Sequence, residues 1–519
     1  MAKKVNITDL TWWLSLVSSS NMGDNQFSVL KNMFYNKDKR IQSRRWYTTF
    51  GNSIWTDPIT SYFFFQNDTT WLRTAICTAG TQMYKYNEWT SNWGSIKTGL
   101  SAFESDGTTR TKWSFAVYKN IVYMCNWVDA YASYDGTTYT EYGSQPKVRY
   151  LRYMWDSIYW WWEDTNPNTM YATSAGASNG NTLNANSLGV WGDELGRINW
   201  MLDLWDLFLV FKDKKIYSVS WDLTQSKPID TQNGWFSHRA IKNVENAILY
   251  YSDVWVDRLK PREWLAGASA LASEPLSNDL RELIDKIKPK HYNANIGYYI
   301  APLNSYYFSF DTSDDWIPDT TLVYNTLVGA WTQYNLPAIY DYWYYIGSTG
   351  NYKYLVSSAN TGQMYEIETW FEDDWEAITS ELTSKKYDFD DPSSWKTMND
   401  IDLIWYKDEW SEINIEVKVD DEVVMTSVIT DTFINTNISE IVSGSIWSQP
   451  IWLYWLWSSS STDDVELYPY LIRLPVSTSW PNIEIRMYSD SQPNVWTLDK
   501  ATIHYDELSV DIFPSANIW

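Results

Sequence analysis

The sequence predicts an all-β protein, with a β-propeller of about six to eight blades followed by a C-terminal antiparallel β-sandwich. Short runs rich in β-branched and aromatic residues recur along the chain, and polar turns separate them. Comparable strand ends recur mostly about 40 to 47 residues apart, which is the length of a four-stranded blade. Beyond residue 380 the expected strands become longer and alternate polar with apolar residues, as in an antiparallel sandwich.

The repeat is clearest in the middle of the chain. Residues 207–211 and 216–219 are apolar runs joined by the polar stretch 212–215, which predicts a hairpin. A second pair, 247–251 and 254–259, is joined at 252–253. Because the same unit appears twice within about sixty residues, we interpret the two hairpins as parts of successive blades.

These patterns divide the chain into three parts. Residues 1–55 carry few alternating segments and are expected to form an extended N-terminal arm. Residues 56–375 are assigned to the propeller and 380–519 to the sandwich. The arm contains two basic clusters that could meet a neighbouring subunit, Lys37, Lys39 and Arg40 in the first and Arg44 and Arg45 in the second.

A helical insertion is expected near residues 276–288, within the propeller. Its apolar positions follow the i, i+3, i+4, i+7 spacing of an amphipathic helix, and they are Leu280, Leu283, Ile284 and Ile287. Ser277 or Asn278 can cap its N-terminus. The apolar stripe either packs on its own domain or contacts a neighbouring subunit.

The tryptophan content is unusual, with 35 Trp against 21 Gly. Many of these tryptophans follow Asn or Asp in the slots of Asn-Gly and Asp-Gly hairpin turns, namely Trp93, Trp127, Trp200, Trp316 and Trp375. The second residue of such a turn needs a positive φ, which costs Trp on the order of 1 kcal/mol and Gly almost nothing. We hypothesise that the gene uses UGA for glycine and was translated with UGA as tryptophan.

Two other readings of the tryptophans remain, a set of sugar-stacking aromatic platforms and a Trp-rich core. Neither explains why the tryptophans follow Asn and Asp. Trp331 lies inside an aromatic strand pattern and Trp395 follows two serines, so both are expected to be authentic.

The charge balance argues against nucleic-acid binding through a basic surface. The net charge of −24 comes from acidic residues spread through the turns, which predicts a solvated surface. A negative wall would also suit a conduit through which DNA slides, since it offers the phosphates no counterions to release. No stretch approaches the roughly 20 apolar residues of a membrane span, and we expect no export signal.

The residue types that carry catalysis show no recognisable spacing. Cys77 and Cys125 form no metal or disulfide motif, and His238, His291 and His504 are scattered and expected to be structural. The acidic pairs 163–164 and 390–391 are expected to cap turns, and the segment 133–139 approaches a sialidase Asp-box but misses its spacing. The sequence therefore predicts a protein that is not an enzyme and has no cofactor or metal.

With Gly in place of the turn tryptophans, several segments resemble those of tailed-bacteriophage virion proteins that contain a β-propeller, of the tail-nozzle, tail-hub and packaged-DNA-stabilisation type. The segments are 206–220, 236–259, 322–337, 387–403 and the C-terminal ATIHYDELSVDIFP. The resemblance covers roughly residues 60–519. It implies a structural subunit of a tail or head-to-tail ring that retains and conducts DNA, and it supplies no catalytic residues.

The resemblance also implies where the protein acts and with what. The expected partners are other phage tail or portal-proximal proteins, further copies in a homo-oligomeric ring, and DNA that passes an acidic lumen without sequence-specific binding. The expected location is the virion tail, after assembly in the host cytoplasm. A host-glycan-binding tail adhesin is the alternative function, and a propeller glycosidase is the second alternative.

Overall fold

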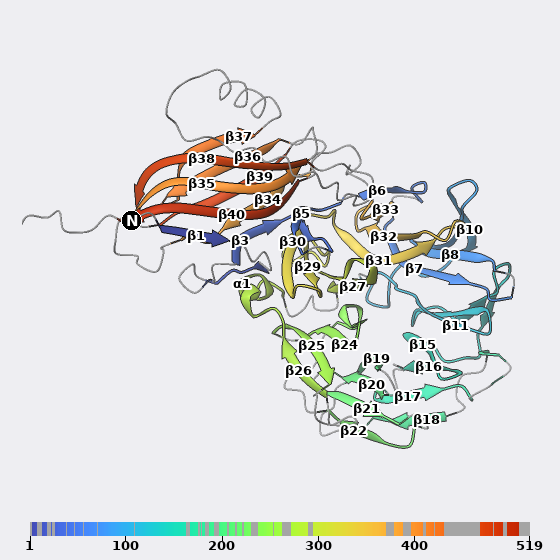
Figure 1. Cartoon of the computed structure of the whole chain (residues 1–519). Helices are drawn as coiled ribbons and strands as arrows, with labels where there is room; N and C mark the ends of the chain where they lie inside the picture. The colour runs from blue at the N-terminus through green and yellow to red at the C-terminus, as the bar shows by residue number, and fades with distance from the viewer. Residues whose placement is uncertain are drawn as a thin grey trace, which may run out of the picture.

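The described strands form seven propeller blades and a two-sheet sandwich beside them, in a computed structural model of the chain (Figure 1). The structure describes residues 3–507 apart from internal segments. Those of five residues or more are 8–12, 162–166, 191–196, 230–236, 262–270, 289–293, 370–377, 388–395, 430–467 and 491–495. The predicted fold class, a propeller followed by a C-terminal β-sheet region, is confirmed.

The first five blades are four-stranded antiparallel sheets whose strands follow one another along the chain. Blade 1 consists of β7 (Ile59–Gln66), β8 (Arg73–Ala79), β9 (Gln82–Asn87) and β10 (Asn92–Thr98). Blade 2 consists of β11 (Ser114–Tyr118), β12 (Ile121–Cys125), β13 (Tyr131–Tyr134) and β14 (Tyr139–Tyr142). Blade 3 consists of β15 (Tyr150–Met154), β16 (Ser157–Trp161), β17 (Thr169–Ala172) and β18 (Asn186–Gly189). Blade 4 is β19 (Ile198–Leu204), β20 (Leu207–Lys212), β21 (Ile216–Val219) and β22 (Ser226–Pro228), and blade 5 is β23 (Lys242–Val244), β24 (Ala247–Tyr251), β25 (Val256–Pro261) and β26 (Leu271–Pro275). The two hairpins expected in successive blades are β20–β21 and β24–β25.

Blade 7 closes the propeller with a strand from the N-terminal part of the chain. Its inner strands are β31 (Ile339–Ile346), β32 (Tyr352–Ser358) and β33 (Met364–Ile367), and its outermost strand is β6 (Tyr47–Phe50). The antiparallel register places Phe50 opposite Met364 and Tyr47 opposite Ile367. Blue β6 therefore lies beside ochre β33 in Figure 1, and the two ends of the propeller are joined within one blade.

Blade 6 is part of a larger sheet that runs on into the sandwich. Its own strands are β27 (Ile296–Ile300), β28 (Ser305–Phe310), β29 (Thr320–Asn325) and β30 (Ala330–Tyr334). Beyond β30 the same sheet continues through β3 (Gln26–Lys31), β34 (Ser380–Ser384), β39 (Glu484–Ser489), β36 (Ile413–Val419) and β37 (Glu422–Ile429), with β2 (Trp13–Leu14) parallel to β3.

The second sheet of the sandwich contains the longest strands of the described chain. Its order is β38 (Tyr468–Trp480), β35 (Lys396–Lys407), β40 (Trp496–Glu507), β5 (Ile41–Ser43) and β4 (Met33–Tyr35), with β1 (Lys3–Ile7) also paired to β40. Alternating side chains of the two sheets, such as Ile415 and Ile503, are fully buried and belong to one core with blade 6 residues such as Phe308. Propeller and sandwich thus share a hydrophobic core as well as a sheet.

Asn32 links the propeller to the sandwich through hydrogen bonds. Its side chain accepts a hydrogen bond from the Asn335 amide at 2.7 Å and donates one to the Thr379 carbonyl at 2.7 Å. The backbone N–H of Asn32 donates a hydrogen bond to the backbone carbonyl of Gln333. A residue buried to this degree must have its polar atoms satisfied, and here the partners lie on the exit of blade 6 and the entry to β34.

Arg44 joins this link between propeller and sandwich to the N-terminal strands, and this differs from the subunit contact expected for it. It is buried, its Nε donates to Asn32 Oδ1 at 3.0 Å, and its Nη2 donates to the Asn335 carbonyl at 3.0 Å. The guanidinium also lies 5.8 Å from the ring centroid of Tyr334. With its donors used inside the chain, Arg44 is not available to a neighbouring molecule.

Residues 1–55 therefore differ from the extended arm expected from the sequence. Of their described strands, β1, β3, β5 and β6 pair with sandwich or blade 7 strands more than 280 positions away, and β2 and β4 pair with β3 and β5. In the turn between β4 and β5, Lys37 and Lys39 are exposed and Arg40 is half-buried. Arg45 is half-buried next to Arg44.

The helical insertion is shorter than expected. A 3₁₀ turn, η4 (Asn278–Leu280), leads into a single turn of α-helix, α1 (Arg281–Ile284). The Ser277 hydroxyl does not cap the helix, because it accepts a hydrogen bond from the Val256 amide at 2.9 Å. The two other short helical turns in the described chain are η2 (His238–Ala240) and η6 (Ala301–Leu303).

The apolar stripe of this insertion packs on its own chain. Leu280, Ile284 and Ile287 are buried in the core shared by blade 6 and the sandwich, and Leu283 packs against it. Of the two readings of the stripe, packing on its own domain is therefore the one observed. No helix in the described part of the chain has the length and apolarity needed to cross a bilayer.

Candidate functional site

A pocket of about 520 Å³ lies among the innermost strands of the blades. Every blade contributes to it, because residues of or next to the first strands β7, β11, β15, β19, β23, β27 and β31 line it, together with η2. The pocket therefore occupies the propeller axis. Its volume falls within the range of roughly 300 to 1,000 Å³ that is typical of ligand sites.

The charge of this pocket is opposite to that of the whole protein. Five cationic residues line it, Lys112, Arg149, Arg152, Arg239 and Lys242. The only carboxylate among the described lining residues is Asp341. In a chain of net charge −24, the axis is thus a local concentration of positive charge.

Each of the three arginines has a carboxylate partner. Arg149 bonds to Glu104, Arg152 Nη2 lies 2.6 Å from Asp203 Oδ1, and Arg239 Nη2 lies 2.9 Å from Asp341 Oδ2. The pairing is incomplete, because the buried Nε donors of Arg152 and Arg239 have no acceptor in the described structure. Arg239 is only 8% exposed, so water does not readily replace that acceptor.

The two lysines have no carboxylate partner among the described residues. The Lys112 ammonium lies 4.7 Å from the ring centroid of Tyr340, which is a cation–π contact rather than an ion pair. Burial and then the nearby Arg239 lower the pKa of Lys112 well below its usual value, and Asp341 only partly opposes this. Burial likewise lowers the pKa of Lys242.

His238 lies at the edge of the same cluster. Its Nδ1 is 3.0 Å from the Tyr150 hydroxyl, so the neutral ring can accept that proton in a hydrogen bond. Burial lowers the pKa of His238 well below its usual value, and the charges of Arg239, Lys112, Arg149 and Lys242 lower it further. The imidazole is therefore neutral in the folded protein near pH 7.

We expect acid to destabilise the propeller through His238. Its folded-state pKa lies below the unfolded value of about 6.5, so the unfolded chain binds more protons and stability falls as pH drops below 6.5. Between pH 7 and pH 5 this contributes up to about 2 kcal/mol. Urea titrations at both pH values check it: the loss in the wild type should exceed that in His238→Gln, and equal losses would contradict the assignment.

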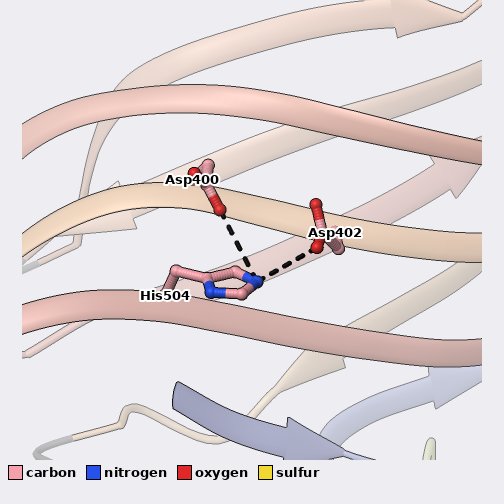
Figure 2. A group of neighbouring side chains, drawn as sticks. All are labelled: Asp400, Asp402 and His504. Atoms are coloured by element: carbon pink, nitrogen blue, oxygen red, sulfur yellow. Dashed lines mark hydrogen bonds and ion pairs between the residues drawn. The ribbon is translucent and has the colours of Figure 1, made fainter. Parts of the chain in front are cut away.

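A second cluster of polar residues lies on the sandwich. Asp400 and Asp402 alternate along β35, and His504 lies across from Asp400 on β40. His504 Nε2 is 3.0 Å from Asp402 Oδ2 and 3.7 Å from Asp400 Oδ1, as Figure 2 shows. The three half-buried side chains could together offer three ligands to a divalent cation, or form a hydrogen-bonded ion pair when the imidazole is protonated.

Other residues singled out in the sequence lie apart from both clusters. The near Asp-box at 133–139 is the hairpin between β13 and β14, where Asp135 accepts hydrogen bonds from the Thr137 and Thr138 amides. Cys77 and Cys125 are buried, unlinked core residues. The acidic pairs 163–164 and 390–391, His291, Trp375 and Trp395 lie outside the described residues.

The outer part of blade 1 carries a larger pocket, of about 890 Å³. Aromatic side chains line it, including Trp71, Trp89, Tyr86 and Tyr345, with Arg73 and Glu88 beside them. Trp71 and Trp89 are 72% and 98% exposed. Exposed tryptophans around a hollow are the kind of surface on which a sugar ring can stack.

No protein-family model matches the sequence, and no curated protein matches it. Solved structures with similar folds include the protein "YCF48 from Cyanidioschyzon merolae" (TM-score 0.40, 8% identity, 62% of this chain and 98% of that chain). A second is the Neurospora crassa Pan2 WD40 domain (TM-score 0.36, 9% identity, 63% of this chain and 96% of that chain). A third is an exo-beta-1,3-galactanase from Phanerochaete chrysosporium (TM-score 0.25, 11% identity, 88% of this chain and 100% of that chain). Because these three TM-scores are below 0.5, the propeller assignment rests on the strand pairings, and no function follows from these names.

Proposed function

We propose that this chain is a non-catalytic structural subunit of a phage tail or head-to-tail ring that retains and conducts DNA. The observation that carries the proposal is the single sheet through blade 6 and the sandwich. A ring subunit must hold two different surfaces at a fixed angle, so that heterologous contacts close by rotation. A shared sheet and a shared core give the two domains that rigidity.

The turn between β4 and β5, where Lys37 and Lys39 are exposed, is the favoured contact with a neighbouring subunit. Lys37, Lys39 and Arg40 form a basic tip on an otherwise acidic protein, which suits docking on an acidic patch of the next copy or of another tail protein. The helical stripe and Arg44 are used inside the chain and are not part of this contact.

Reversing the charge of this tip tests the assembly role. We expect the triple substitution of Lys37, Lys39 and Arg40 to Glu to abolish incorporation into virions while leaving the fold unchanged, as judged by circular dichroism and urea midpoint. The matched control replaces Lys286 and Lys288, exposed residues after α1, with Glu. Normal incorporation of the tip variant, or placement of the protein outside the tail and portal region by cryo-microscopy, would overturn the proposal.

The proposal includes the hypothesis that the gene encodes glycine at some of the positions where this sequence has tryptophan. Of the tryptophans that the structure describes, four have a positive φ, which side chains with a Cβ rarely adopt: Trp71, Trp127, Trp155 and Trp316. Among the described tryptophans, four others have a buried indole N–H without an acceptor, namely Trp93, Trp160, Trp161 and the half-buried Trp200. These backbone and hydrogen-bond features support recoded glycines, although Trp93 and Trp200 lie in strands rather than in the expected turns.

Two tryptophans have the surroundings of authentic ones. Trp331 donates its indole N–H to the Leu276 carbonyl at 2.9 Å, and Trp496 donates to Ser380 Oγ at 2.7 Å. Reading the codons separates the groups: we expect UGA at Trp127 and Trp316 and UGG at Trp331 and Trp496. UGG at Trp127 would rule out recoding there.

The alternative function, a host-glycan-binding tail adhesin, is favoured by the aromatic pocket on blade 1. That surface depends on Trp71, whose φ of 58° is itself suited to glycine. A glycan array probed with the protein and with its Trp71→Gly, Trp89→Gly variant distinguishes the two functions. Reproducible binding that the variant loses would favour the adhesin, provided that both codons are UGG.

A further inference from the structure

The axial pocket holds more positive charge than its own carboxylates balance. Glu104, Asp203 and Asp341 each pair with one arginine, which leaves Lys112 and Lys242 over. Bringing two ammonium groups into a half-buried pocket without counterions costs free energy, because burial removes hydration that nothing replaces. A negatively charged ligand would supply the missing counterions and so offset this unfavourable free energy.

We propose that this pocket binds a compact dianionic oxyanion of the phosphate class, held by Lys112 and Lys242. Two negative charges would match the two lysines left over after the internal ion pairs are counted. This inference concerns the propeller axis and does not depend on a role in a phage tail.

The donors of the pocket suit a tetrahedral oxyanion better than a single carboxylate. Besides the two lysines, Arg149, Arg152 and Arg239 line the same pocket, each already paired with one carboxylate. A phosphate offers several acceptor oxygens in different directions, and charge-assisted hydrogen bonds of this kind are among the strongest in proteins. The volume of about 520 Å³ leaves room for a small group esterified to the phosphate.

The aromatic lining indicates what such a group could be. Tyr298 and Tyr342 also line the pocket, from blades 6 and 7. An uncharged organic part attached to the phosphate could therefore contact apolar rings while the phosphate meets the cations. Inorganic phosphate is the simplest probe, and a phosphate monoester with an aromatic group, such as phenyl phosphate, is the second.

Calorimetric titration of the full chain with inorganic phosphate at low ionic strength tests the site. We expect one equivalent to bind, and affinity to fall at least about tenfold in Lys112→Gln and in Lys242→Gln, since each variant removes a charge-assisted hydrogen bond to the ion. Lys227→Gln is the matched control, because Lys227 is exposed on the outermost strand of blade 4. Phenyl phosphate should bind more tightly than inorganic phosphate.

Three results would overturn the proposal. One is no saturable heat of binding in the wild type together with no phosphate-dependent rise in Tm. A second is phosphate binding that both lysine variants retain at full affinity, which would place the ion elsewhere. The third is binding of an acidic peptide but not of either phosphate, which would make the axis a peptide site. Sodium chloride at matched ionic strength controls for general screening.

Discussion

Replacing Phe50 with alanine is expected to lower the free energy of unfolding by about 3–5 kcal/mol. Phe50 ends β6, the strand that closes blade 7, and its ring is buried 4.8 Å from that of Tyr86 and 5.6 Å from that of Tyr345. It therefore joins blade 7 to blade 1 as well as β6 to β33. Urea unfolding followed by tyrosine and tryptophan fluorescence measures the loss.

Thr49→Ala is the matched control, since Thr49 is exposed on the same strand and a surface substitution usually changes stability by less than about 0.5 kcal/mol. A Phe50 variant as stable as the control would mean that β6 does not close the propeller. The same reasoning applies to truncation. Deleting residues 1–55 would remove strands from blade 7 and from both sandwich sheets, so the chain would misfold before its assembly could be measured.

Glycine substitutions at tryptophans should act in opposite directions in two groups. Trp331→Gly and Trp496→Gly should each cost about 3–5 kcal/mol, because each empties a buried site and removes an indole hydrogen bond. Trp71→Gly and Trp316→Gly should stabilise the fold by roughly 1 kcal/mol each, because both residues have a positive φ and are largely exposed. Chemical denaturation of the four variants shows whether each substitution raises or lowers the free energy of unfolding.

Trp89 is the control for exposure alone. It is 98% exposed but is not among the residues with positive φ, so Trp89→Gly should be neutral or slightly destabilising. If Trp71→Gly and Trp316→Gly destabilise the protein as well, the strain argument for recoded glycines fails, whatever the codons show.

Local patterns were enough to predict the blades, because their strands pair with immediate neighbours in the chain. The hairpins 207–219 and 247–259 needed only short apolar runs and the polar turns that join them. The stripe from Leu280 to Ile287 was also visible as apolar spacing, although the helix itself is one turn long. Spacing alone could not say whether that stripe faced its own core or a neighbour.

Contacts between distant segments were not predictable in this way. Residues 47–50 have no strong strand pattern, and their pairing with β33 depends on an edge created some 300 residues later. The axial pocket was missed for a related reason. Lys112, Arg149, Arg239 and Lys242 are spread over 130 residues, and each alone resembles an ordinary surface charge. Only the circular arrangement of the blades brings them together.

The closure of blade 7 by β6 has a consequence for synthesis. The first 50 residues leave the ribosome long before Met364, and at about 5–20 residues per second the interval is roughly 15 to 60 s. During that time the partner edge for β6 does not exist, and Phe50 has no blade 7 to pack against. The nascent chain thus carries an unpaired, partly apolar strand for most of its translation. Pairing across such a sequence separation is slow to form, so the last step of propeller folding belongs to the completed chain and a chaperone could influence it.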